Sequence, residues 1–228
     1  MRRLYALGAH GVIACVLTSA LAAALLIGRV ALSGGPLFLF LGWNLILAWV
    51  PLLAVLPLAA LRGPSLRDRL LALPFLGVWL AFLPNAPYLL TDVQHLAERA
   101  PVPLWCDAVL LGAFAVAGLT LTAASVYASW RAIAQVYTPF LAHASLVAVG
   151  PLVGLGMYLG RFLRWNSWDL VTRPGLVLAD ILERVVDPLA HPRTWAVTAL
   201  GAAITWVAWA CLASVRATPP SRELADDA

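Results

Sequence analysis

Residues 104–127 read LWCDAVLLGAFAVAGLTLTAASVY and carry one charged side chain, Asp107. A helix needs about 20 consecutive apolar residues to cross the roughly 30 Å hydrocarbon core of a bilayer. A backbone inside lipid must satisfy its own hydrogen bonds, so a run of this length is expected to be an α-helix. This stretch therefore predicts a membrane-spanning helix, and it indicates the class of the whole chain.

Five more apolar runs of similar length precede or follow this one. Together the six runs predict helices that span residues 4–27, 37–61, 70–90, 104–127, 140–160 and 195–215. We therefore expect an all-α polytopic membrane protein with six transmembrane helices in a single domain, residues 1–215. The polar residues 216–228 that follow are typical of a short disordered tail.

The composition of the 228-residue chain agrees with this class. Apolar residues make up 62% of it, charged residues make up 11%, and the mean hydropathy is +0.88. A soluble globular domain carries about 25% charged residues, so soluble, disordered and nucleic-acid-binding proteins are excluded. The partner that the composition implies is the lipid bilayer. The net charge of +4, whose positive part comes from arginine alone, favours contact with anionic lipid.

The longest connection, residues 161–194, contains a second kind of helix. Apolar residues recur in it at helical spacing, and charged residues occupy the positions between them. The apolar set is Leu178, Ile181, Leu182, Val185 and Leu189, and the charged set is Asp180, Glu183, Arg184 and Asp187. This pattern is typical of an amphipathic helix that lies in the membrane interface instead of spanning the membrane. We expect one such interfacial helix over residues 175–189.

The arginines in the connections indicate the orientation. If six spans alternate, the N-terminus, the second and fourth loops and the C-terminal tail carry eight arginines, and the other side carries seven. If the long fifth loop is left out of the count, the number of arginines on the other side falls from seven to two. Because positive side chains are retained on the cytoplasmic side, we expect both termini in the cytoplasm. The five arginines of the fifth loop would then lie on the side that disfavours positive side chains, so their presence there needs a separate explanation.

Polar and aromatic side chains gather on the opposite face, because the first, third and fifth loops share it. The residues expected to bind a substrate there are Asn85, Tyr88, Tyr158, Arg161, Arg164, Trp165, Asn166, Trp168 and Asp169. Arginine binds phosphate and carboxylate groups through forked hydrogen bonds, so the expected ligand is anionic or lipid-linked. If the fifth helix continued through this run, four of these side chains would share about 100° of its circumference, namely Arg161, Arg164, Trp165 and Trp168.

The same arginines and tryptophans also fit a second interpretation, in which they only anchor the chain at the membrane interface. A buried guanidinium without a carboxylate partner is costly. We therefore expect Arg161 to pair with Asp92 or Asp107, which leaves Arg164 free for an external anion.

Pro84 and Pro87 interrupt the third span, because proline lacks a backbone donor and cannot continue a helix. Asn85, between them, is expected to hydrogen-bond a carbonyl group that the break sets free. Beyond the break, Asp92 and His95 are three residues apart, so they are expected to share a helix face.

Asp92, His95 and Asp107 are the candidate catalytic residues, as an acid–base set. Two alternatives are open for them: ligands of a hard metal ion, or an Asp–His hydrogen bond that only holds the loop. No second histidine motif accompanies the pair, so no metal site is predicted. No pattern in the chain identifies a cofactor.

The chain resembles a bacterial family of membrane proteins, domain of unknown function 1361 (DUF1361), through the motifs Trp43–Pro51, Leu83–Tyr88, Thr91–Leu96, Trp105–Asp107 and Tyr158–Asp169. The last motif is the longest and the most specific. Cys106 stands where the family motif is expected to have tyrosine, which argues against an essential thiol. The resemblance implies a multi-pass protein of the bacterial inner membrane, and it implies no reaction, cofactor or partner.

Three functions are compatible with a polar face on such a protein. The first is a membrane enzyme or binding protein for a lipid-linked or anionic substrate at the extracytoplasmic face. The second is a structural or assembly protein that docks an unidentified protein partner through that face. The third is a small transporter, although transporters often contain internal repeats and none is apparent here.

Overall fold

The computed structural model describes residues 2–61 and 63–217, with side chains for 11–61 and 63–215, and this part is helical without a β-strand. Its elements are α1 (Arg2–Ser33), α2 (Leu39–Val55), η1 (Leu56–Ala60), α3 (Leu66–Phe82), α4 (Asn85–Tyr88), η2 (Leu89–His95), α5 (Leu104–Val136), α6 (Pro139–Phe162), α7 (Asp169–Thr172), α8 (Pro174–Val186) and α9 (Pro192–Ala217). Of the tail predicted to be disordered, residues 218–228 lie outside the described residues.

Six helical segments are long and apolar enough to cross a membrane: Gly11–Ser33, Leu39–Ala60, Leu66–His95, Leu104–Val136, Pro139–Phe162 and Pro192–Val215. The predicted all-α fold class with six such helices is therefore confirmed. Helix α5 continues beyond its predicted end at residue 127 and ends at Val136. Ile133 and Val136 in these extra turns are buried against the rest of the protein, so tertiary packing extends the helix past its polar residues.

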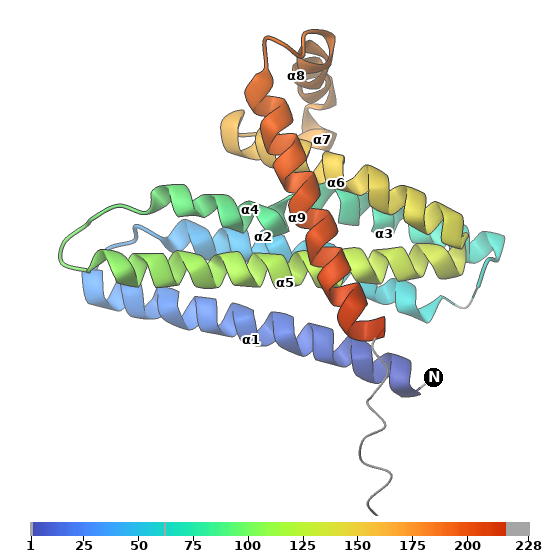
Figure 1. The fold of residues 1–228 in the computed structure, drawn as a ribbon, viewed down its shortest axis with the longest axis horizontal. Helices are drawn as coiled ribbons and strands as arrows, with labels where there is room; N and C mark the ends of the chain where they lie inside the picture. Colours follow the sequence, from blue (N-terminus) through green and yellow to red (C-terminus); the bar gives the residue numbers. More distant parts are fainter. Residues whose placement is uncertain (1, 62, 218–228) are drawn as a thin grey trace, which may run out of the picture.

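The central helix of the fold is α5, and α1, α2 and α3 run beside it along the long axis of the molecule (Figure 1). It is the most buried of the six apolar segments. Polar side chains join it to its neighbours: the hydroxyls of Thr18 and Thr120 lie 3.0 Å apart, and Trp79 Nε1 donates to Ser125 Oγ at 2.9 Å. Such bonds hold helices together in lipid, where burial of apolar surface between helices gains little.

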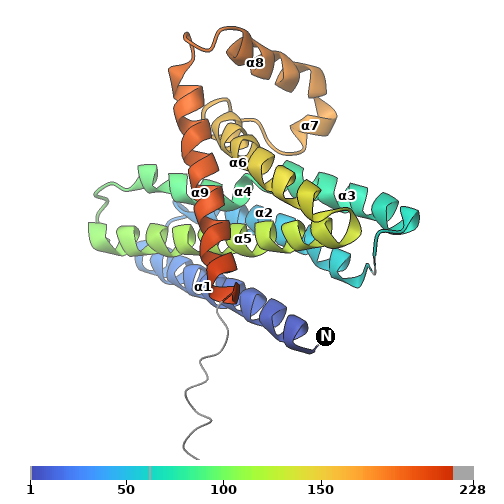
Figure 2. The ribbon, with the colours of Figure 1, turned by 45° about the vertical axis from the view of Figure 1, so that its right-hand side comes forward.

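Helix α9 packs on α6 and lies across α5 instead of alongside it (Figures 1 and 2). A Cβ atom on Gly154 would lie 2.2 Å from the carbonyl oxygen of Thr198, and a Cβ atom on Gly201 would lie 2.4 Å from Gly154 Cα. Only glycine permits so close an approach of two backbones. This contact therefore determines where α6 and α9 cross.

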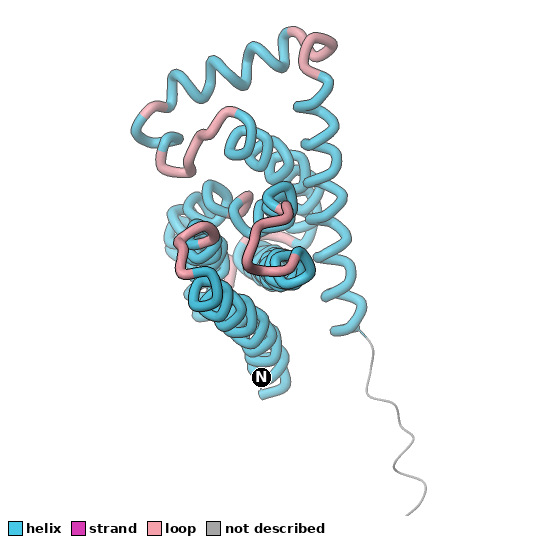
Figure 3. Tube along the Cα trace, turned by 90° about the vertical axis from the view of Figure 1, so that its left-hand side faces the viewer, coloured by secondary structure: helices cyan, strands magenta, loops and turns pink. Residues whose placement is uncertain are grey.

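The short helices α7 and α8 stand at the end of the molecule opposite α1, beside the start of α9 (Figures 1 and 3). The helix expected at residues 175–189 is present as α8, but it ends at Val186, so Asp187 and Leu189 of the predicted pattern lie beyond it. Its inner side buries Val177 and Arg184, whereas Leu178, Leu182 and Val185 on its outer side are at least half exposed. An uncovered apolar face of this kind fits a membrane surface, and its location there stays a prediction.

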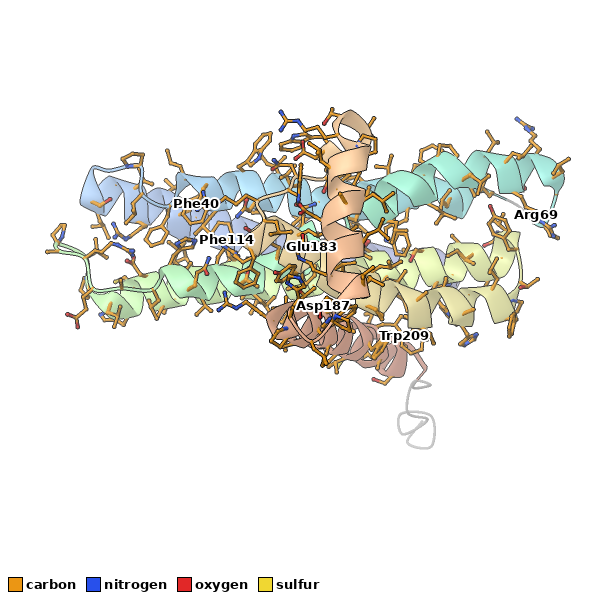
Figure 4. All side chains as sticks on the ribbon, turned by 90° about the horizontal axis from the view of Figure 1, so that it is seen from above. Phe40, Arg69, Phe114, Glu183, Asp187 and Trp209 are labelled. Carbon is orange, nitrogen blue, oxygen red and sulfur yellow. The ribbon has the colours of Figure 1, made fainter. Side chains whose placement is uncertain are left out.

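Seen from above, α8 lies across the long helices (Figure 4). Phe40, near the start of α2, and Arg69, near the start of α3, lie toward opposite ends of the bundle (Figure 4). The second and third apolar segments therefore run in opposite directions, as an alternating topology requires.

Candidate functional site

The third apolar segment is broken, as the two prolines predict. Helix α3 ends at Phe82, and after Pro84 the chain continues as the short helix α4 and the 3₁₀ helix η2. Asn85 Nδ2 donates to the carbonyl oxygen of Phe82 at 2.8 Å, which is the bond expected at the break, and it also donates to Ser167 Oγ at 2.9 Å. Asn85 thus links the broken segment to the loop after α6.

Two glycines accommodate this broken segment. A Cβ atom on Gly118 of α5 would lie 2.3 Å from the carbonyl oxygen of Ala86, and a Cβ atom on Gly156 of α6 would lie 2.4 Å from Pro84 Cγ. The break is therefore held between α5 and α6. As a result, η2 passes beside the last turn of α6.

Helix α6 ends at Phe162, so the arc of four side chains expected on a continued helix does not form. The backbone N–H of Trp165 donates to the carbonyl oxygen of Leu159 at 3.1 Å, and Arg164 adopts a left-handed backbone conformation with φ of 60°. This conformation crowds the Cβ atom of any residue other than glycine and costs about 1–2 kcal/mol. The direction of the Arg164 side chain is therefore determined by this turn and not by the face of a continued helix.

The predicted ion pair between Arg161 and Asp92 is confirmed, with 2.5 Å between Nη2 and Oδ1 and both side chains almost fully buried. Arg161 Nε also donates to Thr91 Oγ1 at 2.9 Å, and its guanidinium carbon lies 4.0 Å from the centroid of the Tyr88 ring. The second oxygen of Asp92 accepts from Asn44 Nδ2 at 3.2 Å. These contacts join α2, η2 and α6 and leave Arg161 without a free charge.

A cavity of about 750 Å³ lies between α2, the broken third segment, the end of α6 and α8. Its polar lining comes from segments that the sequence predicts on one face of the protein. These side chains are Asn44, Asn85, Tyr88, Asp92, Gln94, His95, Arg161, Arg164, Asn166 and Ser167. The structure thus brings most of the predicted site residues together, and Trp165 lines the same cavity.

The remaining lining is mainly apolar and extends along the helices. It consists chiefly of Leu47, Leu80, Ala81, Leu152, Leu155, Leu159, Val177 and Ile181. Because a helix rises 1.5 Å per residue, Leu152 lies about 13 Å from Arg161 along α6. The cavity therefore joins a charged region to an apolar groove, and its volume is within the range of about 300–1,000 Å³ that ligand pockets have.

Arg164 lines this cavity with an exposed side chain. Among the side chains that the structure describes, its guanidinium has no ion pair and no hydrogen-bond partner. Arg161, in contrast, is held by Asp92. Arg164 is therefore the cation of this cavity that remains available to a ligand.

Trp168 and Asp169 line a second cavity, of about 400 Å³, that shares three lining residues with the first. Asp169 Oδ2 accepts the N–H of Asn166 at 2.8 Å, and Oδ1 accepts the hydroxyl of Thr172 at 3.3 Å. The bond from the Asn166 N–H is the main reason that the pKa of Asp169 is lower than its ordinary value. The carboxylate therefore stays ionised and holds the loop in shape.

The structure does not bring Asp107 together with Asp92 and His95. Asp107 is fully buried in the first turn of α5 and forms an ion pair with Arg29 of α1, in which Nε faces Oδ1 and Nη2 lies 3.2 Å from Oδ2. Arg29 is the partner that sequence reasoning missed. The predicted spans place Arg29 just after the first helix, on the side where the fourth span begins, and this shared side was the available signal.

Tyr158 lines neither cavity. It is buried beside Leu159 and Val177, and the guanidinium carbon of Arg184 lies 5.7 Å from the centroid of its ring. Its ring therefore contacts α8, through Val177 and Arg184, instead of the cavity.

His95 does line the larger cavity, and its ring packs against Phe40 with 4.9 Å between the ring centroids. It forms no hydrogen bond with Asp92 among the described side chains, so the Asp–His bond weighed for the loop is absent there. Within residues 11–61 and 63–215, no three side chains of His, Cys, Asp or Glu come together in a group that could hold a metal ion. Phe40 is a lining residue that the sequence analysis missed, although it precedes Asn44 by one helical turn.

A family model described as "Protein of unknown function (DUF1361)" matches residues 43–208. The matched region contains every lining residue of the two cavities except Phe40. No curated protein and no solved structure matches the chain.

Proposed function

We propose that this chain, which belongs to the DUF1361 family of proteins of unknown function, binds an amphipathic molecule with an anionic head group in its larger cavity. The observation that carries the proposal is that one cavity contains both the unpaired guanidinium of Arg164 and an apolar groove along α3 and α6. A lipid-linked anion has the same two parts. The head group binds at Arg164, and the apolar tail lies along Leu155 and Leu152.

The charges of the lining support a ligand that is anionic. The lining contains two guanidiniums, of Arg161 and Arg164, and one carboxylate, of Asp92. Because Arg161 and Asp92 neutralise each other in a buried pair, one positive charge remains for the ligand. A charge-assisted hydrogen bond from arginine to such a group contributes about 1.5–3 kcal/mol.

Binding has more support than acid–base catalysis. The carboxylate of Asp92 is occupied by donors from Arg161 and Asn44, and Asp107 lies outside the cavity. His95 is the remaining member of the proposed set, and it is available to donate a hydrogen bond to a head group.

The proposed location is the bacterial inner membrane, with both termini in the cytoplasm and the polar region of the cavity facing the opposite side. Six helices of sufficient length and hydropathy support a multi-pass membrane protein. When the long fifth loop is left out, the N-terminal side carries eight arginines and the other side carries two, which supports the orientation.

The test compares two ligands with the same tail, farnesyl phosphate and farnesol, on the full-length protein in phosphatidylcholine nanodiscs. Binding to empty nanodiscs is subtracted. We expect farnesyl phosphate to bind more tightly than farnesol, and Arg164→Gln to weaken farnesyl phosphate by roughly tenfold or more, since it removes one charge-assisted hydrogen bond.

The matched control is Arg67→Gln, which removes an exposed arginine from the start of α3, away from both cavities. It should leave the affinity unchanged. Equal binding of farnesol and farnesyl phosphate, or an equal loss in the Arg67 and Arg164 variants, would contradict the proposal.

A further inference from the structure

The second cavity continues the site beyond Arg164. It lies in the loop after α6 and around α7, and its lining includes Arg164, Trp168, Asp169 and Arg173. Arg164 also lines the larger cavity, as do Trp165 and Asn166. One guanidinium therefore stands between two adjoining cavities, of which only the larger has the apolar groove.

The second cavity contains a second arginine that takes part in no ion pair. Like Arg164, Arg173 is exposed, and it forms no ion pair or side-chain hydrogen bond within the part of the chain whose side chains are described. The nearby carboxylate of Asp169 is occupied by the donors of Asn166 and Thr172. The charge of Arg173 also contributes to the lowered pKa of Asp169, but the two groups form no ion pair. Two guanidiniums without an ion pair therefore line the adjoining cavities.

The backbone at Arg164 supports a role for this position. A residue with a Cβ atom rarely adopts a positive φ, and such strained residues cluster at sites that bind ligands. Glycine would make the same turn without strain, but it would place no cation between the cavities. The other arginines near the site are already engaged: Arg161 pairs with Asp92, and Arg193 stacks on the ring of Phe162 at 5.4 Å.

We infer that the second cavity is a subsite for a second anionic group, so that the ligand is an apolar chain ending in a diphosphate. This inference rests on the proposed function and names the class of its ligand. The phosphate next to the tail binds Arg164 in the larger cavity, and the terminal phosphate binds Arg173 in the smaller one. Arginine suits both positions, because its guanidinium matches phosphate oxygens in a forked arrangement.

The experiment measures the affinities of farnesyl phosphate, farnesyl diphosphate and inorganic pyrophosphate for the full-length protein in phosphatidylcholine nanodiscs. We expect farnesyl diphosphate to bind at least tenfold more tightly than farnesyl phosphate. Arg173→Gln should abolish this difference and leave the affinity for farnesyl phosphate within twofold of the original value. Arg164→Gln should weaken both farnesyl ligands.

The matched control is Arg193→Gln, which removes the same charge from the same connection but lines neither cavity. If the preference for diphosphate arose only from non-specific electrostatic attraction, the Arg173 and Arg193 variants would lose this preference equally. That result would overturn the inference, and so would equal affinities of the two farnesyl ligands for the unaltered protein. Pyrophosphate should bind much more weakly, because it lacks the tail. If it binds as tightly as farnesyl diphosphate, no single ligand joins the two cavities.

The failures of the two proposals can be told apart. If farnesyl phosphate binds no better than farnesol, the proposed function fails. If farnesyl phosphate binds through Arg164 but the diphosphate shows no advantage that depends on Arg173, only the inference about the second cavity fails. Melting curves of each variant verify that the protein remains folded, as expected for two exposed arginines.

Discussion

Arg161 and Arg164 are three residues apart and have opposite environments. Arg161 is buried and bonded to Asp92 and Thr91, whereas Arg164 is exposed and free of such bonds among the described side chains. The first therefore holds η2 and α6 together, and the second is available for a ligand. Substitution of Arg161 should therefore affect mainly the stability of the protein, and substitution of Arg164 should affect mainly ligand binding.

We predict that Arg161→Ala lowers the stability of the protein much more than Arg164→Ala. Removing one member of a buried ion pair leaves a buried charge and typically costs about 3–5 kcal/mol. Arg164→Ala removes a solvated side chain and should change the melting temperature little. Thermal unfolding of the purified variants in one detergent measures both effects, and equal losses would contradict the assignment of roles.

A second prediction concerns the backbone of Arg164, whose φ of 60° disfavours every residue but glycine. Arg164→Gly and Arg164→Ala should lose farnesyl phosphate binding to the same extent, since both lack the guanidinium. The glycine variant should nevertheless be more stable than the alanine variant by about 1 kcal/mol, because glycine adopts this conformation without strain. Chemical unfolding of the two variants measures the difference, and greater stability of the alanine variant would count against the left-handed turn.

At the scale of the elements, the sequence predicts the helices well and their ends less well. The six apolar runs, the break at Pro84 and the amphipathic helix are all present, because each follows from hydropathy, spacing or proline chemistry. The fifth span, predicted to end at residue 160, ends at Phe162, but the turn that follows it was not predictable in this way. Residues 163–168 are compatible with a longer helix, and the bonds of Asp169 to Asn166 and Thr172 compete with that continuation.

Gly118 offers a test of how α5 positions the broken segment. A Cβ atom there would meet the carbonyl oxygen of Ala86 at 2.3 Å, and a backbone atom cannot move aside as a flexible side chain can. We predict that Gly118→Ala destabilises the protein by about 1–3 kcal/mol through overpacking and weakens farnesyl phosphate binding. Gly112 on the same helix has no atom within 4 Å of a Cβ position, so Gly112→Ala should be neutral or stabilising by up to about 1 kcal/mol. The melting temperatures of the two variants measure this difference, and decreases of similar size in both variants would refute the packing argument.

At the scale of the whole molecule, the sequence predicts which loops share a face, and the polar lining of the larger cavity agrees with it. It does not predict how α9 lies against the other helices. That arrangement depends on the contact of Gly154 with Thr198 and Gly201, between residues far apart in the chain. The partner of Asp107 was missed for the same reason, because pairing of Arg29 with it depends on how α1 packs on α5.

The last prediction is the membrane topology, for which the crossing of α9 over α5 is the critical feature (Figure 1). Helix α9 has the length and hydropathy of a span. If it crosses the membrane, the C-terminus lies on the side of the N-terminus, in the cytoplasm. If it does not, the C-terminus lies on the side of the third loop, residues 96–103.

Fusions of green fluorescent protein, which fluoresces in the cytoplasm, and of alkaline phosphatase, which is active only outside it, distinguish these cases in a bacterial host. We expect phosphatase activity at the third loop and fluorescence both at the C-terminus and after residue 61, since the second loop carries arginines that favour the cytoplasm. The fusion after residue 61 is the control, because α2 and α3 run in opposite directions on either side of it (Figure 4). Phosphatase activity at both the third loop and the C-terminus would mean that α9 does not span the membrane and that the protein has five transmembrane helices.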